Sequence, residues 1–461
     1  MIAATLFYFI EALLGYLLVK RIAPNLNIYL SLGLSFTLGS GLLVFLLFIL
    51  SVCGLPLNSL AIVIVSLASV FLSLILSLKR VPCMLKDLRE ITDTVVAKYT
   101  FLEILLFAAA SVLLLSVLFQ AVTTAFNMND EFSYWGVAAY RIFSSGTVNL
   151  KNIIFTDFEK YPLYLPINAA IPSILRGYFS ENFSRMATFI TLPFLLLLMF
   201  GAIKDLGLKY KENILFMILI VTSGRIFTRF SGILYADSPF AYFYTAATTV
   251  FALSLNVKDL KQKRRLYFLS GLLFSLTTWV KVEGLMIVAA TIAFGLLVEL
   301  VGKRSEQIYD TIKNFLYIVV PAVFIPLIWI LYGNLANLGQ SGWTTKLFAN
   351  TEFAMSNLGT ILDSMRILAF SLPLYSGFWL LASVALVVGL VFFWKDKRVL
   401  FLSGIILLNV SYLLATYLFV MGSAESLRAA SFDRYIIHFL PIAVYLMAVV
   451  YSRYKQELLS E

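Results

Sequence analysis

The chain contains little charge, cysteine or histidine. Charged residues make up 13% of its 461 residues, and there are two cysteines and one histidine. Soluble domains carry about 25% charged residues, so this composition excludes a soluble globular enzyme and a disordered chain. The cysteine and histidine counts exclude a Cys/His zinc site and a disulfide-rich module. The sequence also lacks a GxxxxGK[S/T] phosphate loop, which argues against ATP-driven transport.

Hydrophobic residues, in contrast, make up 61% of the chain, and the mean hydropathy is +0.92. They form apolar runs, several of them about 18–22 residues long, the length that crosses about 30 Å of hydrocarbon. The runs predict an all-α polytopic membrane protein with about thirteen transmembrane helices. The predicted spans are 2–19, 28–50, 59–78, 101–122, 185–203, 213–223, 235–255, 267–280, 285–301, 315–333, 372–394, 399–421 and 436–452.

Lys and Arg predict how these helices are oriented. Every second connection is short and basic, from Lys20-Arg21 after the first span to Arg453 and Lys455 after the last. Short basic loops face the cytoplasm, so we expect the N-terminus outside and the C-terminus inside. The expected location is the plasma membrane of a bacterium.

The connections divide the chain into five parts. Three leading transmembrane helices are followed by a cytoplasmic amphipathic linker and a transmembrane module with a long external loop, 123–184. A second external loop, which we interpret as a lid, precedes the C-terminal helices. The predicted boundaries are 1–78, 79–100, 101–334, 335–371 and 372–461.

The external loop 123–184 carries two adjacent acids, Asp130 and Glu131. Apolar residues from Phe132 to Phe143 recur at helical spacing and predict a helix lying in the membrane interface. One interpretation of the two acids is structural, because acids in the first turn of a helix interact favourably with its dipole. Their position at the exit of a transmembrane helix, at headgroup level, favours a general base that acts on a membrane-bound substrate.

The stretch from Asn129 to Gly136, NDEFSYWG, resembles the first external loop of GT-C glycosyltransferases. These integral membrane enzymes use polyprenyl-phosphate sugars and include the protein O-mannosyltransferases and the lipid A aminoarabinose transferases. Further elements resemble the same family, in the same order and on the predicted external side. They are KYPLYLP at 160–166, YADSP at 235–239, KVEG at 281–284 and Arg434-Tyr435 with Pro441. The three leading helices have no counterpart in this resemblance.

The resemblance implies an inverting membrane glycosyltransferase. It implies transfer of a sugar from a polyprenyl-phosphate donor to a glycan, lipid or protein acceptor of the cell envelope, on the periplasmic or extracellular face. The partners would be this donor, membrane lipid and the acceptor, with no nucleic acid. Asp130 is the implied catalytic base, and Glu131 would orient the acceptor, share the base role or bind a metal. The resemblance fixes no cofactor; a divalent cation held by Asp130 and Glu131 is compatible with the sequence.

The departing lipid phosphate gains charge and needs a fixed cation. Arg434 is the first candidate, because a guanidinium binds phosphate through two parallel hydrogen bonds. The alternative for Arg434 is a salt bridge with Asp433, and Lys281 and Glu283 could pair with each other. The full set of candidate substrate-binding residues is Arg434, Lys281, Glu283, Tyr161, Tyr164, Trp135, Asp237, Arg225, Arg229, Lys346, Arg428 and His438.

Two other functions use the same compartment and lipid-linked substrates. A lipid-linked oligosaccharide transporter or flippase needs ionisable groups near the middle of the bilayer, whereas the charges here cluster at the outer helix ends. A polysaccharide polymerase or ligase would concentrate cations in a large external loop, whereas the most distinctive residues of this loop are acids.

Overall fold

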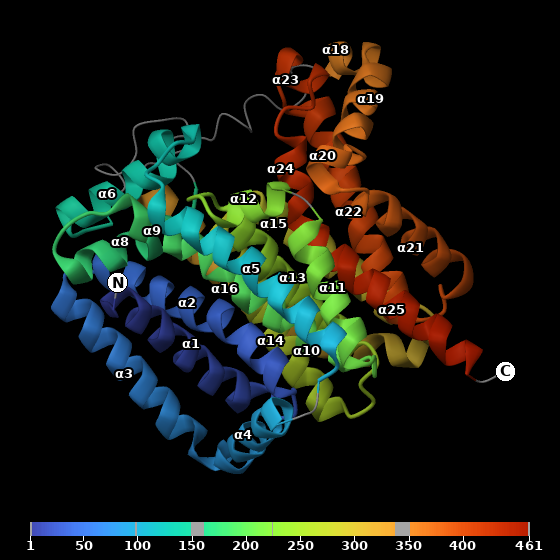
Figure 1. Cartoon of the computed structure of the whole chain (residues 1–461), viewed down its shortest axis with the longest axis horizontal. Helices are drawn as coiled ribbons and strands as arrows, with labels where there is room; N and C mark the ends of the chain where they lie inside the picture. Colours follow the sequence, from blue (N-terminus) through green and yellow to red (C-terminus); the bar gives the residue numbers. More distant parts are fainter. Residues whose placement is uncertain (1, 97–98, 149–160, 224, 337–350, 460–461) are drawn as a thin grey trace.

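The computed structural model describes residues 2–96, 99–148, 161–223, 225–336 and 351–459. Over these residues the chain forms helices and no strand, which confirms the all-helical prediction. A helix lies in each range predicted to be apolar and helical (Figure 1). These helices are α1 (Ile2–Ile22), α2 (Ile28–Val52), α3 (Ser59–Ser77), α5 (Phe101–Thr123), α9 (Glu181–Phe189) with α10 (Thr191–Lys204), α11 (Tyr210–Thr222), α13 (Asp237–Ser254), α14 (Leu260–Val280), α15 (Gly284–Leu300), α16 (Ser305–Leu335), α21 (Phe378–Phe392), α22 (Lys397–Phe419) and α25 (Leu440–Leu458).

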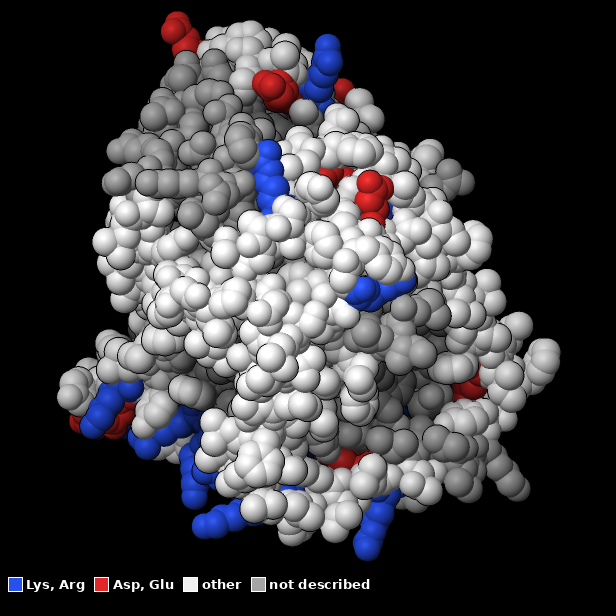
Figure 2. Space-filling model, turned by 90° about the vertical axis from the view of Figure 1, so that its left-hand side faces the viewer, with Lys and Arg blue, Asp and Glu red and all other residues white. Residues whose placement is uncertain are grey.

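Seven helical segments among the described residues are long and apolar enough to cross a membrane. They include α2, α5, α16 and α22, while α15 and α21 are apolar but shorter. Figure 2 shows many Lys and Arg side chains along the lower edge of the molecule and a few near its upper end, with a wide, mostly uncharged surface between them. These features support a membrane protein with several spans. The count of thirteen spans and the side of each loop stay predictions.

Short helices cover the two ends of the long ones. The 3₁₀ turn η1 (Leu78–Arg80) and α4 (Val81–Val96) lie in the predicted cytoplasmic linker, at the bottom of Figure 1. Most of the other short helices gather along the upper side of that view. They are η2 (Glu131–Trp135), α6 (Gly136–Ser145), α8 (Tyr164–Arg176), α12 (Arg225–Ser231), α18 (Thr351–Ser356), α19 (Leu358–Ala369), α20 (Leu372–Tyr375), α23 (Ser423–Leu427), α24 (Phe432–Tyr435) and η3 (Ile436–Phe439).

Helices α1 and α2 pack closely because glycines face each other's backbone. A Cβ atom on Gly39 would lie 1.7 Å from the carbonyl oxygen of Glu11, and one on Gly15 would lie 1.7 Å from that of Ser35. The buried Tyr242 of α13 donates a hydrogen bond to the carbonyl oxygen of Gly33 in α2 at 2.5 Å. The leading helices α1 and α2 are therefore packed into the same core as α13, while α3 and α5 are largely exposed.

Replacing Gly39 by alanine should destabilise the protein by about 1–3 kcal/mol, because the added methyl meets rigid backbone. Unfolding in detergent would measure this loss. Gly359→Ala in α19 is the matched control, since nothing lies within 4 Å of its added Cβ. That variant should change stability by less than about 1 kcal/mol, and in the stabilising direction. Equal stability of the two variants would contradict the close packing of α1 on α2.

Candidate functional site

Polar side chains from five separate segments meet at one end of the helix bundle. Asp130 immediately precedes η2, Tyr161 precedes α8, Asp237 begins α13, Lys281 and Glu283 connect α14 to α15, and Arg434 lies in α24. They are joined by ion pairs and hydrogen bonds. We call this group the Asp237 cluster; its members are Asp130, Tyr161, Tyr235, Asp237, Lys281, Glu283, Arg434, Tyr435 and His438.

Asp130 and Arg434 form the accessible part of the Asp237 cluster. Arg434 Nη1 donates to Asp130 Oδ2 at 2.7 Å. The side chains of Asp130 and Arg434 are 29% and 19% exposed, so both can be reached while they are paired. The backbone N–H of Asp130 donates to the hydroxyl of Tyr235 at 3.2 Å, which fixes the start of the following helix.

Arg434 is held in place by neighbours on several sides. Its Nε lies 3.3 Å from Asp237 Oδ2, and its guanidinium carbon lies 5.2 Å and 5.4 Å from the ring centroids of Tyr235 and Tyr435. Aromatic faces attract a guanidinium through their quadrupole. A guanidinium fixed in this way can bind an anion with little loss of conformational entropy.

Asp237 is the buried centre of the cluster. Its Oδ1 accepts a hydrogen bond from Lys281 Nζ at 2.9 Å and lies 2.8 Å from His438 Nε2. Both neighbours are also buried. A buried carboxylate needs such partners, because an unpaired one is strongly destabilising. Asp237 therefore organises the cations around it.

Lys281, Glu283 and Tyr161 form the side of the cluster next to α15. Lys281 Nζ lies 3.8 Å from Glu283 Oε1, and the Tyr161 hydroxyl donates to the same oxygen at 2.9 Å. Burial lowers the pKa of Lys281, but the carboxylates of Asp237 and Glu283 more than offset this, so its pKa is raised and it stays charged. Burial, followed by the charge of Glu283, raises the pKa of Tyr161 well above its usual value, so its hydroxyl keeps its proton.

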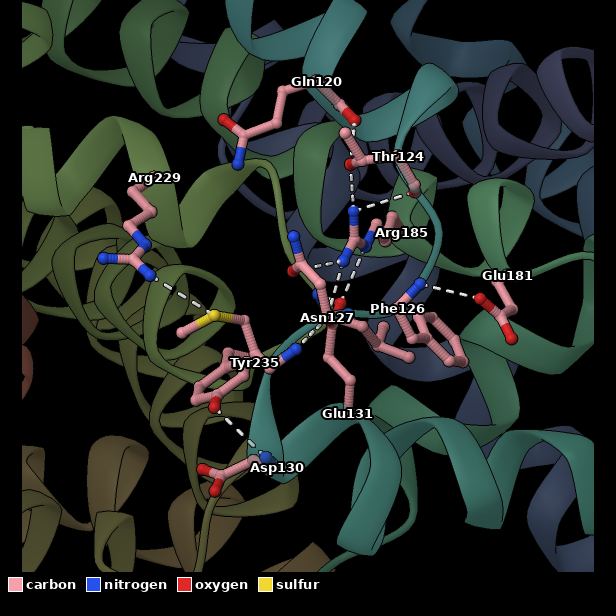
Figure 3. A network of polar contacts seen from close by, with 12 residues as sticks. Gln120, Thr124, Phe126, Asn127, Asp130, Glu131, Glu181, Arg185, Arg229 and Tyr235 are labelled. Carbon is pink, nitrogen blue, oxygen red and sulfur yellow. Dashed lines mark hydrogen bonds and ion pairs between the residues drawn. The ribbon is translucent and has the colours of Figure 1, made fainter.

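Glu131 points away from Asp130 and into a separate network (Figure 3). Arg185 donates to both of its oxygens, from Nε at 2.7 Å and from Nη2 at 2.6 Å, and both side chains are 0% exposed. Three backbone N–H groups, those of Asn127, Met128 and Leu234, donate to the same carboxylate. Glu131 therefore anchors the loop between α5 and η2 to α9 and to the segment before α13.

Gly136 follows Glu131 in a tightly packed part of the loop. A Cβ atom there would lie 2.3 Å from the ring of Phe126, so the glycine lets the loop fold back against the helix. Residues Glu131–Trp135 form a π-helical turn, which inserts an extra residue into the helix.

The environment of Glu131 does not suit a divalent cation. A metal ion there would have to displace the guanidinium of Arg185 and the backbone donors. Among the described residues, no group of three or more His, Cys, Asp and Glu side chains is arranged to hold a metal ion. Asp130, in turn, already pairs with Arg434.

Other candidate residues lie outside the cluster or outside the described chain. The buried Tyr164 hydroxyl lies 3.0 Å from Ser40 Oγ of α2, so the structure does not bring it to the Asp237 cluster. Trp135 is buried and packs edge-on against Tyr161, with ring centroids 5.5 Å apart. Both aromatic residues therefore sit in packed surroundings rather than on an open surface.

The remaining cations differ in how they are placed. Arg229 is exposed and donates to Met128 Sδ at 3.3 Å, near Asp130 in the chain, and Arg428 is exposed at the end of α23. Arg225 begins α12, but its side chain lies outside the described part, as does the whole of Lys346 with residues 337–350 of the predicted lid.

Sequence reasoning missed Arg185, Tyr235 and Tyr435. Arg185 is the first residue of a predicted apolar span, and a charge at that position could have suggested a buried partner such as Glu131. Tyr235 and Tyr435 lie inside motifs that were singled out, and aromatic residues beside a predicted phosphate-binding Arg could have suggested stacking on it.

An apolar groove runs between α15 and α16 and ends beside the cluster. One part, with a volume of about 460 Å³, lies between α15 and α16 and is lined by side chains such as Ala293, Phe315 and Leu327. A second part, of about 240 Å³, shares four of its lining residues and is also lined by Pro162 and Val282, next to Tyr161, Lys281 and Glu283. The shared residues are Thr278, Leu285, Pro326 and Ile330.

No protein-family model matches this chain, and no curated protein matches it. Among solved structures, similarity is found to the archaeal oligosaccharyltransferase AglB from Archaeoglobus fulgidus, in complex with an inhibitory peptide and a dolichol-phosphate. The similarity covers 76% of this chain, with 12% sequence identity and a TM-score of 0.45. This chain spans 50% of the length of that protein.

Proposed function

We propose that the chain is a membrane glycosyltransferase of the GT-C type. It transfers a sugar from a polyprenyl-phosphate donor to a cell-envelope acceptor, on the external face of the plasma membrane. The observation that carries this proposal is the Asp237 cluster. An accessible acid, Asp130, lies beside a fixed guanidinium, Arg434, and residues of separate predicted motifs join them there.

Asp130 is the proposed general base. Its Oδ2 is paired with Arg434, while Oδ1 makes no hydrogen bond with any described residue and can accept the acceptor proton. As the acceptor oxygen or nitrogen loses this proton, it forms a bond to the anomeric carbon. The bond from that carbon to the phosphate oxygen breaks on the opposite face, the electron pair leaves with the phosphate, and the sugar configuration inverts.

Arg434 is the proposed partner of the leaving phosphate. Within the described chain its contacts use Nε and Nη1, so Nη2 can donate to a phosphate oxygen. Charge develops on that oxygen in the transition state, and a fixed cation in a partly dry site stabilises it. Lys281 and His438, which hold Asp237, position Arg434 indirectly.

The groove between α15 and α16 supports a lipid-linked donor. The part of the groove lined by Phe315 and Leu327 is almost entirely apolar, as the isoprenoid chain of such a donor is. The part lined by Pro162 and Val282 ends next to Lys281 and Glu283. A donor lying in this groove would place its phosphate close to the Asp237 cluster. The proposed orientation of the donor therefore follows from the position of the Asp237 cluster beside one end of an apolar groove.

Filling the groove should weaken donor use without changing the base. In Ala293→Trp, we expect the KM for the polyprenyl-phosphate sugar to rise roughly tenfold or more, because the indole occupies part of the apolar groove. Steady-state kinetics with varied donor would measure it. Ala290→Trp, also exposed on α15 but outside the groove lining, should leave KM unchanged. Equal KM values in both variants would contradict donor binding in the groove.

Chelation of divalent cations by EDTA should leave the rate of sugar transfer unchanged. Glu131 is engaged in its ion pair with Arg185, and we propose no metal ion at Asp130, which pairs with Arg434. The test compares the initial rate of transfer in EDTA with the rate in added Mg²⁺ or Mn²⁺. Loss of transfer in EDTA that returns with the metal would contradict this assignment and favour a cation at Asp130.

A further inference from the structure

A second recess lies at the opposite end of the molecule from the Asp237 cluster. Helix α13 begins in the cluster at Asp237 and ends near the recess, which is lined from Leu255 onward. At 1.5 Å per residue, this helix separates the two sites by about 27 Å. The recess has a volume of about 980 Å³ and lies between the ends of α13, α15, α21 and α25 and the beginnings of α14, α16 and α22.

Two of the three acids that line this recess, Glu299 and Asp396, are engaged by its own residues. Glu299 is buried; it lies 2.5 Å from Lys263 Nζ and accepts a hydrogen bond from the Tyr267 hydroxyl at 2.8 Å. Asp396 accepts a hydrogen bond from Arg453 Nε at 2.5 Å. These pairs form a fixed polar wall and offset the charge of two of the three lining acids; the third acid is the exposed Glu457.

Other cations of the lining are not paired. Lys258, Lys303 and Lys395 are exposed around the recess and make no ion pair with any described residue. Lys397 also lines the recess and lies 4.0 Å from Glu299, at the limit of an ion pair. Basic side chains outnumber acidic ones in the lining by six to three, so the recess carries an excess of positive charge.

We propose that this recess binds a phosphate-bearing anion. Three ammonium groups around one hollow attract a multiply charged oxyanion, and the polar side chains of Asn256 and Thr311 add hydrogen-bonding groups. The phosphate could come from an anionic phospholipid headgroup or from a soluble phosphate. Phe392 and Leu260, both exposed at the recess, provide apolar surface for the acyl chains of a lipid. The proposal does not depend on the glycosyltransferase function.

The test uses the full chain in nanodiscs of phosphatidylcholine. In one arm phosphatidylglycerol is added to the bilayer, and in the other inorganic diphosphate is added to the buffer. The apparent affinity in each arm comes from the rise in unfolding temperature with ligand concentration. The variant Lys258→Gln/Lys303→Gln/Lys395→Gln should bind on the order of a hundredfold more weakly than wild type. The control Lys79→Gln/Lys86→Gln/Lys209→Gln removes the same charge outside the recess and should bind like wild type.

Each outcome decides between the alternatives. Stabilisation by phosphatidylglycerol that is lost in the recess variant and kept in the control supports the site and identifies the lipid headgroup as its ligand. The same pattern with diphosphate supports the site with a soluble ligand. No stabilisation of wild type in either arm overturns the proposal, as does equal binding by the recess variant and the control.

Discussion

In Asp130→Asn, sugar transfer should fall by roughly 10²–10⁴-fold, the usual contribution of a positioned general base. Asparagine keeps the shape of the side chain but cannot take the acceptor proton. Arg434 retains its contact with Asp237, so the site should stay assembled. The measurement is transfer from a panel of radiolabelled polyprenyl-phosphate sugars in nanodiscs, with the unfolding temperature recorded for each protein.

Asp310→Asn is the control for this experiment, because Asp310 is exposed near the beginning of α16 and has no place in the cluster. It should transfer at the wild-type rate. Undiminished transfer in Asp130→Asn would exclude Asp130 as the base and leave the class of enzyme intact. Loss of transfer together with a lower unfolding temperature would assign Asp130 to structure instead.

Removing the partner of Glu131 should have the largest effect on stability. In Arg185→Met, the free energy of unfolding should fall by about 3–5 kcal/mol, because a fully buried carboxylate loses its cation. Three backbone N–H groups still donate to Glu131, but they do not neutralise its charge. Equilibrium unfolding in detergent would measure the loss.

Arg229→Met is the matched control. This arginine is exposed, and the hydrogen bond described for it goes to Met128 Sδ. Its stability should change by less than about 0.5 kcal/mol. An equal, small effect in both variants would show that the Glu131 network does not hold the loop in place.

The positions of the long helices could be predicted from sequence because hydrocarbon imposes a simple rule on length and apolarity. The packing of those helices could not. Gly39 lies against the backbone of Glu11 because of the rotation of α1 against α2, which the sequence does not specify. The α14–α16 contact, where Gly271 lies against the backbone of Ile318, is unpredictable for the same reason.

The site was predictable to the level of its motifs. Residues of the acid pair and of the four later motifs were singled out, and the structure brings Asp130, Asp237, Glu283 and Arg434 together. The different surroundings of Asp130 and Glu131 could not be predicted. They arise from the π-helical turn after Asp130 and from Arg185, whose approach to Glu131 depends on tertiary packing.

The order in which the ribosome adds the residues of the site has a consequence for the assembly of the protein. Arg185 follows Glu131 by 54 residues, whereas Arg434 follows Asp130 by 304. At about 5–20 residues per second, a ribosome makes Arg434 roughly 15–60 seconds after Asp130. During that interval the loop can already be anchored, while the proposed base has no cation beside it. Under the proposed function, a growing chain would therefore stay inactive until its last helices are in place, and this delay would protect lipid-linked sugars from a half-assembled enzyme.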